Sequence, residues 1–462
     1  MSMERRDQQN LNLIESTSPT HSSGQQRQMK LSPEFESWRI RISLKAQRDT
    51  KFVFTNLFKH INIESLKEAF TAINGSKAVG VDQITKQDYG RNLEANLEDL
   101  LIRIKKGTYR PKPKREILIP KANGKTRPIA ISSLEDKLVD WCVGTILQEV
   151  YEPLFIRNSF GYRRGKSAHQ AIEASYYSLE KGNRPHVVEI DFSNFFNTIP
   201  HKKLMKVLNK RIADKRFIGL IYRLLTGEIM SSTNGQTLPS MIGTPQGGIA
   251  SPTLANIYLN EVVDQWFIEN HSSYNNIIVR YADDAVFFFK KEDEAKEFLT
   301  QLRQRVKTYG LSMNEEKTRV IKLEKKSTES FNFLGFTFYR GKQGSRRTLK
   351  IKTQKEKLNK AIVDFYQWIK TNRNKYKLEK LWDIAKAKIT GHLNYYCYWM
   401  NNTKIFHFYA EATQSLFKWL NRRSQKRSYN LAGFKERVKN FPLMPEMKNI
   451  KWKSLGRSFG NI

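Results

Sequence analysis

Cysteine is scarce in this sequence: Cys142 and Cys397 are the only two among 462 residues. Two thiols cannot form a disulfide framework or a zinc site made of cysteines, and such scarcity is typical of proteins from a reducing intracellular compartment. The sequence also lacks an apolar run long enough to span a bilayer and the pattern of a secretory signal peptide. We therefore expect a cytoplasmic protein that has no membrane partner.

Acidic residues are few relative to basic ones. Lys and Arg number 80 against 45 Asp and Glu, which gives a formal net charge of +35 and a pI of about 9.9. This excess indicates a polyanionic partner. From about residue 100 onward the basic residues are interleaved with Tyr, Trp and Phe, as in proteins that contact both phosphates and bases. Charge alone does not distinguish an enzyme from a ribosomal-type RNA-binding protein.

Two adjacent carboxylates interrupt the apolar stretch IIVRYADDAVFFF at residues 277–289. We predict a β-hairpin whose turn holds Asp283 and Asp284, because β-branched and aromatic residues flank them on both sides. Two carboxylates beside an apolar sheet repel each other and lose hydration, and a bound cation offsets both penalties. A solvated acidic turn is the alternative interpretation of an isolated Asp-Asp pair.

A third carboxylate ends another apolar strand. In HVVEIDFSNFFNTIP (residues 186–200), Asp191 follows three aliphatic residues and lies 92 residues before Asp283. Nothing local pairs these two carboxylates, but adjacent strands of one sheet could bring them together. Two-metal phosphoryl transfer needs carboxylates that hold two ions about 3.5 to 4 Å apart. Phe196, in the same stretch, is either a core residue or part of this site.

Two stretches offer groups suited to a nucleotide. KANGKTRPIAI at residues 121–131 contains a strong hairpin signal, and Lys121 and Arg127 flank the expected turn, where they are either solvated or bind a triphosphate. MIGTPQGGIASPTLAN at residues 241–256 is a glycine-rich loop before a helix, whose N-terminus favours phosphate. Gln246 lies between a proline and two glycines, and we predict that its side chain contacts a ligand held against the backbone.

SFGYRRGKSAHQAI at residues 159–172 forms a compact basic loop before a helix. Its cations Arg163, Arg164 and Lys166 are candidates for contacts with nucleic acid. His169 has no Ser, Cys or Glu arranged with it for acid–base chemistry. We interpret this histidine as a packing or RNA-contact residue.

The sequence from about Leu349 onward is predicted to be helical, with Leu358, Ile362 and Phe365 at helical spacing. Four cations follow in NRRSQKRSYN: Arg422, Arg423, Lys426 and Arg427. We predict a helical bundle whose basic and aromatic faces clamp a nucleic-acid duplex. Residues 1–30 are rich in Gln, Ser, Asn and Thr, and we expect them to be disordered.

Taken in order, these motifs resemble a known family. The series KANGKTRPIAI, SFGYRRGKSAHQAI, EIDFSNFFNTIPH, GTPQGGIASPTLAN, YADD, GLSMNEEKT and FNFLGF resembles the fingers and palm blocks of reverse transcriptases. More narrowly it resembles those encoded by bacterial group II introns, the intron-encoded maturases. HLNYYCYW and WLNRRSQKRS are similar to the thumb, or maturase, domain of that family. The resemblance extends over roughly residues 54–441.

The resemblance implies an α+β fold: a right-hand polymerase with fingers, a ferredoxin-like palm and an α-helical thumb of the maturase or X-like kind. The implied divisions are a disordered tail at 1–30, an N-terminal extension and fingers at 31–186, a palm at 187–345 with a fingers insertion near 201–240, a helical thumb at 346–430 and a C-terminal tail at 431–462.

It also implies roles for individual residues. Asp191 and Asp283 would be the principal Mg²⁺ ligands and Asp284 the third carboxylate, in a site for two ions where Mn²⁺ can substitute. Lys317 is the candidate general acid for the departing pyrophosphate. The implied nucleotide-binding residues are Lys121, Arg127, Phe192, Phe196 and Gln246, with Phe196 as the gate that excludes a ribose 2′-hydroxyl. The candidate nucleic-acid contacts are Arg163, Arg164, Lys166, Arg422, Arg423, Lys426 and Arg427.

The sequence departs from the family pattern at three places. Asn197 stands where Asp is common, Arg164 where Pro is usual, and Ile249-Ala250 where Pro-Leu is usual. None of these positions belongs to the aspartate triad. The sequence also shows no HNH endonuclease, so we expect no second-strand cleavage of a DNA target by this chain.

The expected function is RNA-directed DNA polymerisation of the group II intron type, together with binding of a structured RNA. The implied partners are that RNA, an RNA template, a DNA or RNA primer, and dNTPs, in the bacterial cytoplasm near the nucleoid. One alternative is a domesticated group II-like reverse transcriptase that copies a dedicated non-coding RNA, for example in antiviral defence. Another is a splicing cofactor that mainly binds RNA. The sequence does not identify the template, the primer or the oligomeric state.

Overall fold

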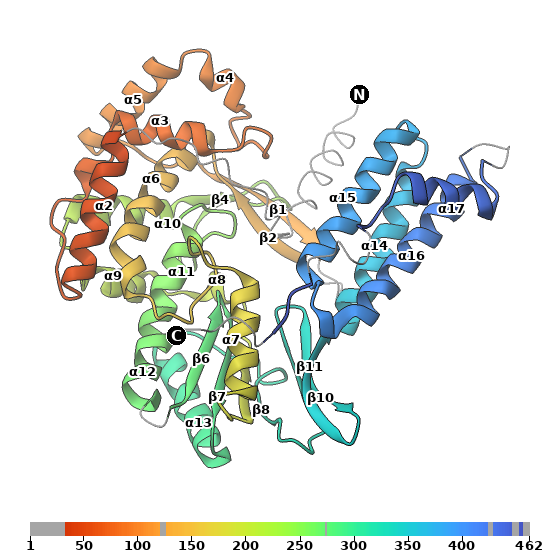
Figure 1. Cartoon of the computed structure of the whole chain (residues 1–462). Helices are drawn as coiled ribbons and strands as arrows, with labels where there is room; N and C mark the ends of the chain where they lie inside the picture. The colour runs from red at the N-terminus through yellow and green to blue at the C-terminus, as the bar shows by residue number, and fades with distance from the viewer. Residues whose placement is uncertain (1–32, 121–125, 273–274, 424–427, 446–451, 456–462) are drawn as a thin grey trace. The chain divides into compact units, whose positions relative to one another are not determined.

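The computed structural model describes residues 33–120, 126–272, 275–423, 428–445 and 452–455 (Figure 1). The chain divides into two compact units. The first contains the described residues of 29–171 and 188–319, and the second those of 172–187 and 320–462. Both combine helices and strands, so the fold is of the mixed α+β class that the sequence predicts.

The first unit contains most of the helices. They are α2 (Pro33–Arg48), α3 (Ile63–Ala72), α4 (Lys86–Gly90), α5 (Leu93–Lys106), α6 (Leu134–Tyr151), α8 (Phe195–Thr198), α9 (His201–Asn209), α10 (Lys215–Thr226), α11 (Ser251–Leu259), α12 (Gln265–His271) and α13 (Glu292–Thr308). A π-helical turn, Asn260–Asp264, joins α11 to α12. α6 is central, because apolar residues around most of its circumference are buried. Its N-terminus is capped by the Ser133 side chain, which accepts a hydrogen bond from the backbone N–H of Asp136.

One sheet of the first unit has the strand order β2-β1-β4-β5. Its strands are β1 (Lys114–Pro120), β2 (Thr126–Ile131), β4 (Glu228–Met230) and β5 (Thr237–Pro239). β1 and β2 pair antiparallel, with Ile117 opposite Ile129. This pairing confirms the predicted hairpin, while residues 121–125 of its turn, including Lys121, lie outside the described residues.

A further sheet has the order β6-β7-β3-β8, with β6 (Ile277–Tyr281), β7 (Asp284–Phe289), β3 (His186–Ile190) and β8 (Arg319–Lys322). β6 and β7 pair antiparallel side by side, as predicted (Figure 1). Phe287 of β7 is buried against Phe267 of α12 and Phe298 of α13, with ring centroids 5.2 and 4.5 Å away. This aromatic core fixes the strands that carry the acidic turn.

The second unit contains α7 (Ala168–Glu180) from its fifth residue, Ile172, onward, and a three-stranded antiparallel sheet in the order β11-β10-β9. Its strands are β9 (Ser330–Phe333), β10 (Phe336–Gln343) and β11 (Arg346–Thr353). Gly335 has φ +79° in the turn between β9 and β10, a conformation that favours glycine. The prediction of helix from Leu349 onward is wrong, since Leu349 lies in β11. There Leu349 and Ile351 alternate with polar residues and are fully buried, the pattern of a half-buried strand.

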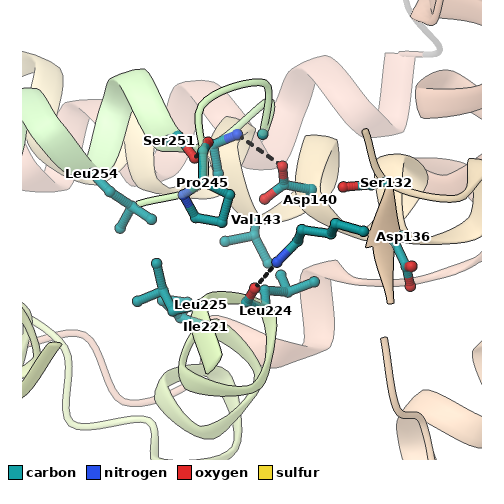
Figure 2. Close-up of a pocket in the computed structure, with 13 residues that line it drawn as sticks. Ser132, Asp136, Asp140, Val143, Ile221, Leu224, Leu225, Pro245, Ser251 and Leu254 are labelled. Atoms are coloured by element: carbon teal, nitrogen blue, oxygen red, sulfur yellow. Dashed lines mark hydrogen bonds between the residues drawn. The ribbon is translucent and has the colours of Figure 1, made fainter. Parts of the chain in front are cut away.

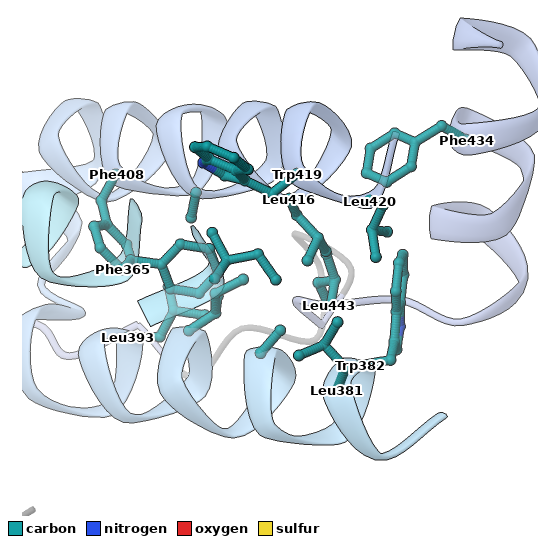
Figure 3. Packing of buried hydrophobic residues seen from close by; sticks show 14 of the residues in the cluster. Phe365, Leu381, Trp382, Leu393, Phe408, Leu416, Trp419, Leu420, Phe434 and Leu443 are labelled. Atoms are coloured by element: carbon teal, nitrogen blue, oxygen red, sulfur yellow. The ribbon is translucent and has the colours of Figure 1, made fainter. Parts of the chain in front are cut away.

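The remaining helices of the second unit form a bundle. They are α14 (Lys355–Asn372), α15 (Leu378–Tyr396), α16 (Asn402–Leu420) and α17 (Leu431–Asn440). Figure 3 shows their shared core, where Phe365, Trp382, Leu416 and Phe434 lie among other buried apolar side chains. Within the described residues, no helix combines the length and the apolar composition needed to cross a membrane.

Candidate active site

Asp191 follows directly after β3 and is held by the segment between α13 and β8. Its backbone carbonyl accepts a hydrogen bond from the backbone N–H of Asn314 at 2.7 Å, and its carboxylate Oδ2 accepts one from the Asn314 side chain at 3.2 Å. Lys317 Nζ donates to the same Oδ2 at 2.9 Å. The carboxylate of Asp191 therefore has a fixed position and a compensating positive charge beside it.

Asp283 and Asp284 lie at the turn between β6 and β7. The last pair of the ladder is Tyr281 with Asp284, so Ala282 and Asp283 form the tip of the turn. β7 neighbours β3 in the sheet, which brings the turn close to Asp191. The pKa of Asp283 is raised by burial and also by the carboxylate of Asp191. The structure thus brings the two predicted carboxylates within electrostatic reach of each other.

The donor chemistry of these three side chains fits Mg²⁺, which takes oxygen ligands and is commonly held by one or two carboxylates together with substrate phosphates and water. In the part of the chain that the structure describes, no three His, Cys, Asp or Glu side chains are gathered into a complete metal cluster. A partial carboxylate set is compatible with ions whose coordination is completed by a nucleotide. Asp191, Asp283 and Asp284 are the groups here that would hold them.

Gln246 and Arg127 contact each other directly. Arg127 Nε donates to Gln246 Oε1 at 2.6 Å, and the backbone N–H of Ala130 donates to the Gln246 carbonyl at 2.8 Å. Gly247 has φ +114°, and a Cβ there would lie 2.7 Å from the Ala130 carbonyl oxygen. Only glycine fits this close approach between the loop and β2, so the two predicted nucleotide-binding side chains are held together.

The same loop is anchored from α6 by Asp140, a residue that the sequence analysis did not single out. Asp140 Oδ2 accepts hydrogen bonds from the backbone N–H groups of Ile249 at 2.5 Å and Ala250 at 3.2 Å, just before α11 begins. Figure 2 shows Asp140 pointing at this loop across a small cavity of about 20 Å³. Lys114 also lines the cavity, and its Nζ donates to the Leu224 carbonyl at 2.6 Å. The hydrogen bonds of Asp140 fix the end of the loop opposite Gln246.

Phe192 and Phe196 are buried on either side of Phe195, whose ring centroid lies 5.6 and 5.5 Å from theirs. The carbonyl of Phe196 accepts a hydrogen bond from the backbone N–H of Thr244 at 2.6 Å. Phe196 therefore lies against the loop that carries Gln246. Its predicted role as a gate against ribose stays a prediction.

Tyr162 belongs to the site although the sequence analysis did not select it. Its backbone has φ +56°, and the preceding Gly161 packs so closely on the acidic turn between β6 and β7 that a Cβ there would lie 2.3 Å from the Ala282 nitrogen. Burial and the nearby Asp283 raise the pKa of the Tyr162 phenol, while Arg127 lowers it. The flanking glycines of SFGYRRG were the available signal, because they indicated an unusual backbone.

The candidate nucleic-acid contacts in the loop at residues 159–167 differ in their exposure and in the partners of their side chains. The side chain of Arg163 is 6% exposed and bonds to Glu152 and to the carbonyls of Ile156 and Ser159, so it braces its own loop. Arg164 is 55% exposed and pairs with Glu149 at 2.8 Å. Lys166, also in this loop, is half-buried. The geometry favours Arg164 and Lys166 over Arg163 for a contact with RNA, and all three roles stay predictions.

Two of the predicted thumb cations lie at the end of α16. The guanidinium of Arg422 lies 5.3 Å from the ring centroid of Trp419, and Arg423 donates to the Tyr376 carbonyl at 3.0 Å. Lys426 and Arg427 lie outside the described residues. The RNA contacts of these four cations stay predictions.

Comparison with known proteins identifies the central part of the chain. Residues 119–338 match the family model described as "Reverse transcriptase (RNA-dependent DNA polymerase)". Protein YkfC of Escherichia coli K12 is 34% identical over 224 residues, which cover 46% of this chain and 58% of that protein. The group II intron-encoded protein LtrA of Lactococcus lactis subsp. cremoris is 34% identical over 224 residues, covering 48% of this chain and 37% of that protein. The aligned part thus spans about half the length of these relatives, and the predicted resemblance is confirmed.

Proposed function

We propose that this chain, whose residues 119–338 form a reverse transcriptase domain of the group II intron-like type, is an RNA-directed DNA polymerase that extends a primer with dNTPs. The observation that carries the proposal is the placement of Asp191 directly after β3 and of Asp283 and Asp284 in the turn that begins the neighbouring β7. Three carboxylates at one end of one sheet are suited to phosphoryl transfer. The high positive charge of the chain suits its nucleic-acid substrates.

The side chains of the site have separate roles in the proposed reaction. Bound Mg²⁺ ions would activate the primer 3′-hydroxyl and stabilise the charge that develops on the transferred phosphate. Lys317 holds a proton at Nζ, because the carboxylate of Asp191 raises its pKa, and this proton can be donated to the departing pyrophosphate. Arg127, oriented by Gln246, presents its remaining N–H groups to the triphosphate.

We assign the predicted subdivisions on the same basis. The sheet β6-β7-β3-β8 corresponds to the palm, the hairpin β1–β2 to the fingers, and the bundle α14–α17 to the thumb. In this assignment the bundle begins with α14 at Lys355, and the predicted boundary of the thumb at residue 346 stays a prediction. We propose a cytoplasmic location, because dNTPs and RNA are both present there.

We also propose that the second unit binds a structured RNA, as an intron-encoded maturase would. Residues 320–462 contain 32 Lys and Arg against nine Asp and Glu. Within the described bundle, Lys370 of α14 and Arg373 just after it lie 5.9 and 4.9 Å from the ring centroid of Trp419, and Arg422, after α16, lies 5.3 Å from it. Such a mixture of cations and aromatic rings suits phosphates and bases together.

The polymerase proposal is tested by primer extension on a defined RNA template with Mg²⁺ and dNTPs. We expect the unaltered protein to extend the primer, and Asp283→Ala and Asp191→Ala to abolish extension while still binding RNA. Asp383→Ala is the matched control, because this exposed aspartate lies on α15 in the other unit. Extension by Asp283→Ala at the unaltered rate would contradict the proposal.

The biological role is tested by purifying the protein from its own host and sequencing the RNA that stays bound through a high-salt wash. A large RNA that includes the coding frame of this protein is the result expected for an intron maturase. A short, unrelated and abundant RNA would overturn that role and indicate a domesticated polymerase with a dedicated template.

A further inference from the structure

A fully buried arginine lies three residues before the first aspartate of the catalytic turn. Arg280 has no exposed surface, and each nitrogen of its guanidinium donates at least one hydrogen bond. Nε and Nη2 donate to the two carboxylate oxygens of Asp264 at 2.8 and 2.5 Å. Nη1 donates to Asn256 Oδ1 at 2.8 Å and to the backbone carbonyl of Ala282 at 2.9 Å. The side chain of Arg280 thus joins two helical elements to the tip of the turn that carries Asp283.

The turn needs such a restraint because of its backbone conformation. Ala282 has φ +57°, in the left-handed region that a residue with a Cβ rarely adopts. A left-handed non-glycine residue persists only where its surroundings over-determine it. Arg280 holds the carbonyl of Ala282 on one side, and Gly161 packs against its nitrogen on the other. The direction in which Asp283 leaves the turn follows from these two contacts.

The network is closed by Asn256 and by the π-helical turn. Asn256 Nδ2 donates to the carbonyl of Gly161 at 2.7 Å, while its Oδ1 accepts from Arg280. Asp264 ends the π-helical turn, a local insertion of the kind that often marks functional sites, and its side chain is fully buried. Every contact of Arg280 is therefore made by a residue that is itself held in place.

A purely structural ion pair would not need the bond to Ala282. Buried ion pairs contribute little net stability and are often replaced by apolar residues at no loss, whereas removing one partner alone leaves an unpaired buried charge. Replacing both charged residues by apolar ones should therefore preserve the fold but lose the bond to the turn. Stability and site geometry can thus be separated.

We propose that Arg280 is a positioning residue: its guanidinium fixes the carbonyl of Ala282 and thereby directs Asp283 toward Asp191. This inference rests on the proposed polymerase function, because it concerns the same carboxylates. Arg280 contacts neither substrate nor nucleotide, and it acts through the backbone of the turn.

The test compares three proteins: the unaltered chain, Arg280→Lys, and the double variant Arg280→Met with Asp264→Leu. Lysine keeps a charge opposite Asp264 but cannot span both Asp264 and Ala282, and the double variant removes the pair without leaving a charge. Mn²⁺ binding is measured by electron paramagnetic resonance without nucleotides, and kcat and KM for primer-template by extension. We expect both variants to bind Mn²⁺ about tenfold more weakly or worse and to lose kcat, with KM for primer-template unchanged.

Asp214→Asn is the matched control. Asp214 is buried and accepts hydrogen bonds from the backbone N–H groups of Leu57, Phe58, Arg216 and Phe217. Its loss should lower the melting temperature and leave Mn²⁺ affinity intact. If the folded variants of Arg280 bind Mn²⁺ and turn over like the unaltered protein, the positioning role is wrong while the polymerase function stands. If the unaltered protein itself fails to extend primers, the proposed function is wrong.

Discussion

Lys317 can serve two purposes. It compensates the charge of Asp191, and this pairing raises the pKa of Lys317, so that the ammonium group stays protonated and holds a proton for the departing pyrophosphate. Arginine would keep the pairing but releases its proton far less readily. We predict that Lys317→Arg lowers kcat about 100-fold while leaving KM for dNTP within about twofold. Single-turnover extension measures this. If the Lys317→Arg variant extends the primer at the unaltered rate, Lys317 only compensates the charge of Asp191 and does not act as the general acid.

Asp140 offers a second prediction for a single residue. It anchors the loop beyond Gln246 through two backbone N–H groups. Asp140→Ala leaves these donors without their acceptor, so the free energy of unfolding should fall by about 1–3 kcal/mol. The loop should also hold Gln246 less firmly, and KM for dNTP should rise by about tenfold. Urea unfolding and steady-state extension measure the two effects.

The control for that variant is Asp383→Ala on the exposed face of α15, which should change neither quantity. A variant Asp140→Ala that loses stability but keeps its KM for dNTP would show that the anchor does not reach the nucleotide site.

Residues such as Asp140, Asp264 and Arg280 show why part of the site could not be predicted. Asp140 accepts a hydrogen bond from the backbone N–H of Ile249, which lies 109 positions later in the sequence. Nothing in the local pattern of α6 distinguishes Asp140 from an acidic residue at the surface. Arg280 precedes an obvious motif, but its partners come from α11 and the π-helical turn. Long-range partners of this kind become visible only when the chain is folded.

At the scale of elements, the local pattern was informative where residues alternate or repeat. The β6–β7 and β1–β2 hairpins followed from apolar strands around a turn signal, and their pairing is confirmed. The sequence alone does not predict β11, because the helical spacing of Leu358, Ile362 and Phe365 begins shortly after this strand ends. Its partner β10, with which Leu349 pairs opposite Arg340, decides in favour of a strand. Tertiary pairing overrides local propensity in such cases.

The helical bundle of the second unit carries a prediction about pH. His392 on α15 stacks on Phe408 with ring centroids 3.8 Å apart, and burial lowers its pKa to about 4 from the ordinary value of 6.5. Its Nε2 has no hydrogen-bond partner among the described residues, so a charged ring would be uncompensated. Between pH 4 and 6.5 the histidine is protonated in the unfolded state but not in the folded state. The contribution of this residue to the free energy of unfolding is therefore fully present above pH 6.5 and is lost as the pH falls toward 4.

We therefore predict that the unfolding free energy decreases by up to about 3 kcal/mol between pH 6.5 and 4 on account of this residue. His392→Leu should flatten this part of the pH profile, measured by denaturant unfolding of the second unit. His407→Leu, at an exposed position of α16, is the control and should leave the profile unchanged. An unaltered slope in His392→Leu would show that the ring is not buried uncharged.

At the scale of the whole molecule, the net charge of +35 should dominate binding to RNA. Affinity for a polyanion falls with salt in proportion to the number of phosphates contacted. We predict that Arg422→Gln with Arg423→Gln lowers the slope of log K against log salt by about one to two. Filter binding at several salt concentrations measures the slope.

The matched control is Lys296→Gln with Lys307→Gln, because these exposed cations lie on α13 in the first unit. This pair should change the slope less than the substitutions at the end of α16. If both double variants change the slope equally, the salt dependence reflects the net charge of the chain, and the end of α16 has no special part in binding RNA.

The central claim is that the chain copies RNA into DNA, and the most direct measurement is single-nucleotide extension of one primer on four RNA templates that differ only in the first unpaired base. On each template only the complementary dNTP should be added, the matching ribonucleotide should be added poorly, and Asp283→Ala should add neither. Addition that ignores the template base, or no addition by the unaltered protein with either Mg²⁺ or Mn²⁺, would contradict the claim.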